Sequence, residues 1–265
     1  MFLCCGCTLY VAPEREQCST TSDCMNRGFV NTTCVNSVCR QPDPWACVHS
    51  VPSPTGNSST VTATLNLVEL ISASPMSNVE GRVCRKLDVD CADPLLSGLF
   101  SGDDGKLSVH IGNGFDGYVE LTLPGAMPGL YFFDPALTKD RDILAIPIVT
   151  QDTLVRFAQL AGVDAAPDRS AVFLGAHDCL DEPAAGIRFV STDADDATAT
   201  FYLIQKIPSA SATATDSEGR GGLINLRAGS ITVSGQLATG ETVGTVSLFT
   251  RENQVTYASL VPSLE

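Results

Sequence analysis

The side chains best suited to catalysis are scattered along this chain of 265 residues. Its three histidines, His49, His110 and His177, lie far apart, and none forms an HxH or HExxH pair that would hold a metal. The sequence also lacks a G-x-S-x-G nucleophile elbow and a phosphate-binding P-loop. These observations predict a protein that is not an enzyme and has no catalytic residue, bound metal or cofactor.

Two patterns still point to a metal. His177 lies beside Asp178 and Cys179, which could form a Cys–His or metal site, but we interpret it as a structural residue at a strand end. Loop carboxylates suit calcium, although none fits the D-x-[DN]-x-[DN]-G pattern with a distal Glu. We interpret them as solvated turns and leave calcium as the alternative. The acidic clusters are Asp88/Asp90/Asp93, Asp103/Asp104 and Asp193/Asp195/Asp196.

Cysteines crowd the N-terminal part of the chain, with a C-x5-C-x9-C-x4-C-x7-C spacing from Cys18 to Cys47. The residues between them are turn formers without a hydrophobic period, so this segment needs covalent staples. Zinc would favour close C-x2-C pairs, often with histidine, so disulfides are the preferred interpretation. We expect two bridges, alternating in order, among Cys18, Cys24, Cys34 and Cys39. Cys47 then either faces Cys179 or stays free.

A separate disulfide is predicted between Cys84 and Cys91. Six residues separate them, at the end of one predicted strand and in the following loop. A bridge is sterically possible if their Cα atoms lie within about 4.4 to 6.8 Å.

The first residues resemble part of an export signal. Gly6-Cys7 fits the end of a bacterial lipoprotein signal, in which the cysteine is lipidated and becomes the new N-terminus. The charged n-region and most of the apolar core are missing, as a misplaced start codon would explain. Cys7 is therefore the lipidation candidate, and a truncated export signal with ordinary cysteines is the alternative.

Charge and composition restrict the partners and the compartment. Acidic residues outnumber basic ones 30 to 16, giving a formal net charge of −14, which repels nucleic acids and anionic lipid headgroups. No run approaches the ~20 apolar residues of a membrane-spanning helix. Eleven cysteines indicate a chain that matures outside the reducing cytosol. We expect a secreted protein or one lipid-anchored to the bacterial envelope.

From Val61 onward the pattern is that of short β-strands. Apolar and polar residues alternate with period two, and Gly, Pro and Asp separate the runs, as is typical of a β-sandwich. The exception is the stretch 150–162, where Thr150 can cap a helix and Gly162 can end it. We expect that helix to pack where two sandwiches meet, because strand and turn motifs recur in both halves.

The recurring order is a small-Ala-Gly turn, a strand, an acidic turn ending in Gly, and another strand. In the second half it comprises Gly186 and Thr215-Asp216-Ser217-Glu218-Gly219. This order resembles the carboxypeptidase regulatory-like domain, a prealbumin-like (transthyretin-like) β-sandwich, over about 62–149 and 169–265. The first copy departs from it at Gly102, where that family has Asp. Intradiol dioxygenases also use such a sandwich, but the pair of close histidines that holds their iron is missing here.

The whole chain is similar to a group of uncharacterised myxobacterial envelope proteins with lipid anchors. That resemblance implies a location in the cell envelope and a fold, but no activity. The matching stretches are 43–47 (DPWAC), 83–91 (VCRKLDVDC), 114–120 (GFDGYVE) and 131–135 (YFFDP).

Together these features predict an all-β protein of two prealbumin-like antiparallel β-sandwiches joined by a short helix, with a small Cys-rich N-terminal module. We expect a non-enzymatic envelope or secreted protein for adhesion, binding a protein or carbohydrate ligand at the cell surface. Nucleic acid is not expected as a partner, and a membrane is expected only through a lipid anchor. The alternative is a secreted hydrolase or oxygenase with an unrecognised site in a sandwich-loop pocket. The predicted segments are a leader region (1–17), a disulfide module (18–47), a linker (48–60), the first sandwich (61–149), a helical connector (150–168) and the second sandwich (169–265).

Overall fold

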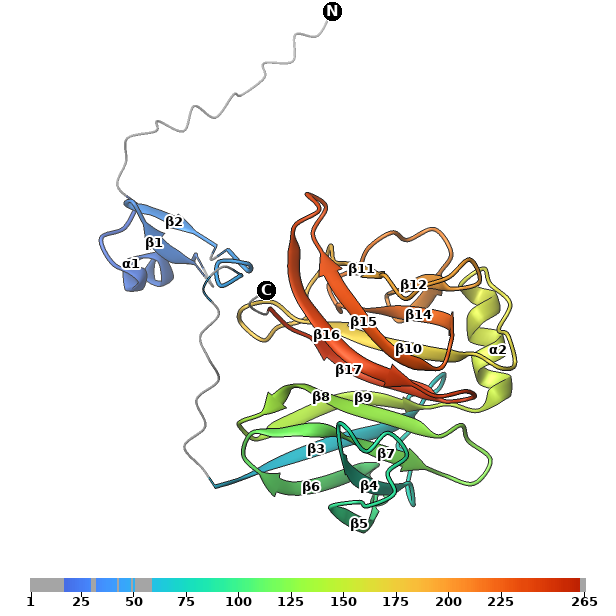
Figure 1. Ribbon diagram of the computed structural model, residues 1–265. Helices are drawn as coiled ribbons and strands as arrows, with labels where there is room; N and C mark the ends of the chain where they lie inside the picture. The colour runs from blue at the N-terminus through green and yellow to red at the C-terminus, as the bar shows by residue number, and fades with distance from the viewer. Residues whose placement is uncertain (1–16, 30–31, 42, 49, 51–58, 263–265) are drawn as a thin grey trace, which may run out of the picture. The chain divides into compact units, whose positions relative to one another are not determined.

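The computed structural model describes residues 17–29, 32–41, 43–48, 50 and 59–262, and the chain divides into two compact units, Met1–Ala46 and Cys47–Glu265 (Figure 1). The first unit contains helix α1 (Thr21–Asn26) and the hairpin of β1 (Thr33–Val35) and β2 (Val38–Arg40). Asn36 and Ser37 connect the hairpin with φ angles of 49° and 62°, which a two-residue type I′ turn requires.

The second unit is built from short strands in two successive sets. The first set is β3 (Thr60–Glu69), β4 (Glu80–Arg85), β5 (Leu96–Phe100), β6 (Lys106–Gly112), β7 (Phe115–Thr122), β8 (Gly129–Leu137) and β9 (Arg141–Ile148). Helix α2 (Gln151–Leu160) follows. The second set is β10 (Ser170–Ala176), β11 (Arg188–Ser191), β12 (Ala199–Ile204), β13 (Ile207–Ser209), β14 (Arg220–Leu226), β15 (Gly229–Gln236), β16 (Thr242–Thr250) and β17 (Val255–Leu260).

The two sets share one large sheet. Its order is β13-β12-β14-β10-β17-β8-β7-β4-β5, and two three-stranded sheets, β6-β3-β9 and β11-β15-β16, complete the layers (Figure 1). The strands of the two halves do not interleave in the large sheet. They meet where β17 pairs in parallel with β8, from Val255↔Gly129 to Tyr257↔Tyr131.

The halves have related strand orders, as the recurring motifs predicted. β3 pairs antiparallel with β6 and parallel with β9, just as β10 pairs with β14 and β17. The trio β4-β7-β8 likewise corresponds to β11-β15-β16. One strand differs: β5 pairs with β4, whereas β12, at the same place in the chain order, pairs with β14. The fold class predicted from the sequence is therefore confirmed.

The period-two pattern explains the core of the first half. Val61, Ala63, Leu65 and Leu67 on β3 are all buried, and the residues between them face outward. Burying one face of a strand fixes its register, because a slip of one residue would expose the whole apolar set.

Helix α2 is the predicted helix. The Thr150 hydroxyl accepts a hydrogen bond from the Thr153 amide at 3.2 Å, and Gly162 follows the helix with φ +80°. The Phe157 ring lies 5.1 Å from Phe173 and 4.9 Å from Phe201, centroid to centroid. These residues belong to a core cluster that includes residues of both halves, so the helix packs into a core that the halves share. Among the described residues, no helix is long and apolar enough to cross a membrane.

Candidate functional site

A groove lies at one end of β4, β5 and β7. Its volume is about 790 Å³, and it is lined by Asn78, Glu80, Phe100, Thr122, Leu123 and Pro124. Strand register sets its floor, because Glu80 is the cross-strand partner of both Phe100 and Thr122. An aromatic ring, a carboxylate and a hydroxyl therefore stand side by side in one row across three strands.

The aromatic member of this row is open to solvent. Phe100 is 59% exposed as a residue, although it belongs to a strand of the large sheet. An exposed ring can lie against an apolar ligand face, and the Glu80 carboxylate, the Asn78 amide and the Thr122 hydroxyl can bind neighbouring polar groups. The arrangement suits a ligand with both an apolar face and hydrogen-bonding groups, such as a sugar or an extended peptide.

A buried serine fixes one wall of the groove. The Ser101 hydroxyl donates to the Met76 carbonyl at 2.7 Å and accepts from the Val79 amide at 3.0 Å. The Ser101 carbonyl accepts from the Asn78 amide, also at 3.0 Å. These bonds hold the residues beside Asn78 and Phe100 in a defined conformation, so the groove wall is formed before any ligand arrives.

None of the groove residues was predicted from the sequence to bind a ligand. The period-two pattern did not predict the strand Leu96–Phe100, and the exposure of Phe100 depends on β5 being the last strand of the sheet. An aromatic residue directly before the turn Ser101-Gly102 was the only available signal.

A second polar cluster links the two halves. Glu120 on β7 is a buried residue, 5% exposed. Its carboxylate forms ion pairs with Arg82 on β4 and with Arg251 from the turn between β16 and β17. The Arg251 guanidinium also donates to the Val89 carbonyl and lies over the Tyr118 ring, 5.8 Å from its centroid. Because charge-assisted bonds to a buried carboxylate are strong, this cluster is structural.

Arg251 reaches a loop that is closed by a disulfide. Cys84 and Cys91 are bonded, with Cα atoms 5.4 Å apart, within the range expected from the sequence. The Asp88 carboxylate accepts hydrogen bonds from the backbone amides of Asp93 and Ala92, both at 2.9 Å. These bonds lower the pKa of Asp88 from its ordinary value.

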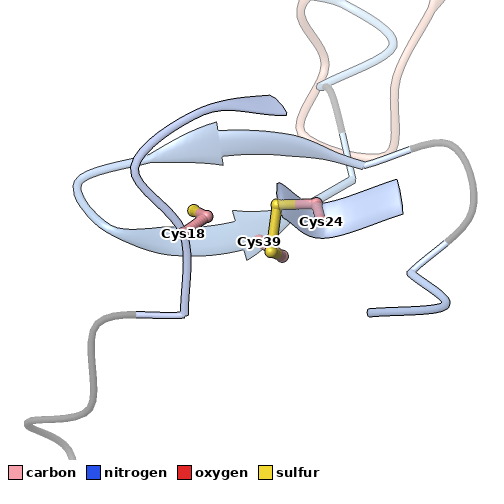
Figure 2. Close-up of side chains that lie close together, drawn as sticks. All are labelled: Cys18, Cys24 and Cys39. Carbon is pink, nitrogen blue, oxygen red and sulfur yellow. A yellow bond between two sulfur atoms is a disulfide. The ribbon is translucent and has the colours of Figure 1, made fainter. Parts of the chain in front are cut away.

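The remaining described disulfides follow the alternatives set out from the sequence. Cys18 is bonded to Cys34 and Cys24 to Cys39, the alternating order, and Figure 2 shows the bond between Cys24 and Cys39. Cys47 is bonded to Cys179, 132 residues away, with Cα atoms 5.8 Å apart. Cys179 is thus no thiol nucleophile for His177. Cys7 lies outside the described residues and stays a prediction.

The acidic residues considered for calcium have other partners. The Asp195 carboxylate contacts Arg169 at 2.8 Å and Arg227 at 2.7 Å. The hydrogen bond from Arg169 is the main cause that lowers the pKa of Asp195 to about 2. Asp193 accepts from the Thr232 amide and Asp104 from the Lys106 amide, at 2.8 and 3.1 Å. In the structure these carboxylates act as turn and ion-pair partners.

The histidines do not converge in the described part of the chain. His110 Nδ1 lies 3.0 Å from the Thr62 hydroxyl on a sheet surface. His177 Nδ1 lies 3.2 Å from the Asp181 carbonyl, which supports the structural interpretation.

Burial would raise the pKa of Asp181, but Arg141 and Lys139, at 2.9 and 3.2 Å, lower it overall. His49 lies outside the described residues.

Comparison with known protein families finds no match, and no curated protein is similar in sequence. Distantly similar solved structures include the following three. The Bacillus anthracis TIE protein is 10% identical, with 78% of this chain and 34% of that chain covered and a TM-score of 0.28. A Streptococcal ancillary pilin is 15% identical, with 79% and 64% covered and a TM-score of 0.27. BcpA, the major pilin subunit of Bacillus cereus, is 8% identical, with 77% and 100% covered and a TM-score of 0.27. The chain thus spans less than two thirds of the first two proteins.

Proposed function

We propose that this chain is a non-enzymatic envelope or secreted β-sandwich protein that binds a saccharide or protein ligand. The observation that carries the proposal is the row of Phe100, Glu80 and Thr122 across three strands, with its ring open to solvent. In a sandwich whose other large side chains mostly fill the core, such a ring on a sheet edge is a natural anchor for a ligand.

The groove also separates this proposal from the enzymatic alternative. Hydrolysis or oxygenation needs convergent titratable groups or a metal in a pocket. Among the described residues that line the groove, Glu80 has the only titratable side chain. A single carboxylate beside a ring supports binding better than general acid–base chemistry, which commonly uses two groups.

Location and family belong to the same proposal. The four disulfides among the described residues fit an oxidising compartment. Lipid attachment at Cys7 would hold the protein at the envelope, and ordinary secretion is the alternative. Membership of the carboxypeptidase regulatory-like family rests on the motifs around Gly186 and Gly219.

Binding can be tested with the full chain on an array of neutral oligosaccharides and on a panel of extended synthetic peptides. Phe100→Ala should weaken any specific interaction roughly tenfold or more, because it removes the anchor at the centre of the row. Glu80→Gln should weaken it less, and should tell whether a carboxylate is required. The matched control is Ile71→Ala, since Ile71 is also an exposed apolar residue, at 68%.

Two results would contradict the proposal. One is a bound sugar or peptide whose affinity is the same for Phe100→Ala and the unaltered chain. The other is the absence of any specific binder in both collections while circular dichroism shows a folded protein.

A further inference from the structure

Strand β6 forms one edge of the three-stranded sheet β6-β3-β9 (Figure 1). It pairs with β3 from Thr60↔Gly112 to Asn66↔Lys106 without a register shift. The strand contains no proline and no residue with a positive φ angle. A regular edge strand of this kind presents a row of backbone groups to which another strand can pair.

The hydrogen bonds of β6 show which of its backbone groups face outward from the sheet. Just beyond the strand, the Asn113 amide donates to the Ser59 carbonyl at 3.2 Å, on the side of β3. Because the direction alternates along a strand, the N–H and C=O groups of Ser108 and His110 point to the other side, the open edge. None of the described residues hydrogen-bonds to these backbone groups.

The second half of the molecule shows what can occupy such an edge. β14 is the counterpart of β6, and β12 pairs antiparallel with its outer side. Phe201 on β12 is 1% exposed, and its ring lies 4.9 Å from that of Phe157, so this outer strand contributes to the core. In the first half β5 pairs with β4 instead. Among the described strands, none therefore lies on the outer side of β6.

The two edges of the sheet β6-β3-β9 differ in their protection. β9 contains Ala145 with φ +54° and Pro147, which discourage the pairing of a further strand. β6 has neither feature. Only its first residue is engaged outside the sheet: the Lys106 amide donates to the Asp104 carboxylate, and its carbonyl accepts from the Gly102 amide. The open stretch is therefore 107–112.

We propose that this open edge of β6 binds an extended segment of another polypeptide as an antiparallel strand, in the place that β12 occupies beside β14. Every second side chain of the segment is apolar and lies on the inner face, with Leu107, Val109 and Ile111. The side chains between them are uncharged and polar and lie beside Ser108 and His110. A second copy of this chain is a poor occupant, because each copy has a formal net charge of −14. The site shares no residue with the groove, so the two proposals can fail independently.

Methylation of the ligand backbone tests this geometry directly. The probes are fluorescent, uncharged peptides of about eight residues that alternate threonine with leucine, valine or phenylalanine. Directly opposite residues share a face of the sheet, so the threonine N–H groups face β6 and the apolar residues' N–H groups face away. N-methylation of the threonine amides should weaken binding to the full chain about tenfold or more. N-methylation of the other amides should change it less than about threefold, measured by fluorescence anisotropy.

Variants of β6 place the peptide at the open edge. Ser108→Pro removes an N–H that β3 does not use, which an edge strand tolerates, and should weaken binding about tenfold or more. Ser108→Ala keeps this N–H and should change binding less than about twofold. Phe100→Ala alters the groove alone and should also leave peptide binding unchanged. Circular dichroism checks the fold of each variant, and the methylation pattern decides if Ser108→Pro does not fold.

Four results would overturn the proposal. The first is that the unaltered chain binds none of these peptides, and the second is that both methylation patterns weaken binding equally. The third is loss of binding in Phe100→Ala, which would place the peptide in the groove. The fourth is self-association of the peptide-free chain that Ser108→Pro abolishes in analytical ultracentrifugation, which would identify a second copy as the occupant.

Discussion

The two sandwiches share a strand order but end differently. β9 is the last strand of the first half and stays at the edge of its sheet, whereas β17, its counterpart, lies between β10 and β8. β9 contains Ala145 with φ +54° and Pro147, and β17 contains no proline and no positive φ. A proline and a left-handed residue discourage the pairing of a further strand. The residues of the last strand therefore account for the unpaired edge at β9 and for the pairing of β17 with the other half.

The halves also differ in one strand that changes partner. β5 continues the large sheet beyond β4, with Gly98 at φ +69° near a register shift, whereas β12 pairs with β14. The groove row needs β5 next to β4, because Phe100 pairs with Glu80 there. The first half therefore has this candidate binding site, and the repeat unit as such does not provide it.

The largest expected effect on stability concerns β17, the strand through which the two halves pair. The Val255 amide donates to the Pro128 carbonyl of the first half at 3.0 Å, and Val255 is 1% exposed. Val255→Pro should lower the free energy of unfolding by about 3 kcal/mol or more, since it removes this bond and constrains a central strand. Urea unfolding followed by circular dichroism measures the loss.

Ser97→Pro is the control for that experiment. Ser97 is exposed and lies at the register shift of edge strand β5, so its loss should be below about 1 kcal/mol. Similar losses of unfolding free energy for the two variants would show that pairing between β17 and β8 stabilises the fold no more than the pairing of an edge strand does.

The buried carboxylate at the junction should have the next largest effect. The side chains of Glu120 and Arg251 are 6% and 19% exposed. The Arg82 side chain is 38% exposed, so water can solvate its charge more easily when the carboxylate is lost. Glu120→Ala should therefore lower the free energy of unfolding by about 2–3 kcal/mol, somewhat less than for a fully buried pair. Glu252→Ala removes an exposed carboxylate beside Arg251 and should change stability by less than about 0.5 kcal/mol. Equal stability of the two variants in thermal unfolding would contradict a structural role for the cluster.

The smallest expected effect concerns β9, the edge strand of the first half. Pro147→Val gives this edge strand a backbone N–H and should lower the free energy of unfolding by about 0.5–1 kcal/mol through the unfolded chain. It should also make the protein associate weakly as concentration rises, measured by analytical ultracentrifugation. Pro167→Val, at an exposed loop position, is the control without association. If Pro147→Val stays as monomeric as that control, this proline does not protect the edge.

Local sequence rules predicted what depends on neighbours in the chain. The alternation from Val61 to Leu67 predicted a half-buried strand, and Thr150 with Gly162 predicted a capped helix. The bridge between Cys84 and Cys91 also followed from short spacing. In each case the partners are within a few residues, so backbone geometry leaves few choices.

Contacts across long sequence distances could not be predicted in this way. The alternatives for Cys47 stayed open until the fold brought Cys179 beside it, and no motif linked Glu120 to Arg251. The groove residues carried no sign of a site in the sequence: Thr122 fits a predicted strand, Glu80 directly precedes one, and the strand that contains Phe100 was not predicted.

The amino-acid pattern was enough to establish the class of the protein: short alternating strands in two related halves, a cysteine-stapled module and an acidic, histidine-poor chain without catalytic motifs. The choice of neighbouring strands emerged only in the folded chain, and with it the shared nine-stranded sheet, the row at Phe100 and the bond between Cys47 and Cys179. The physical reason is that periodicity records which face of a strand is buried. Partner choice depends on edges, bulges and packing between segments far apart in the chain.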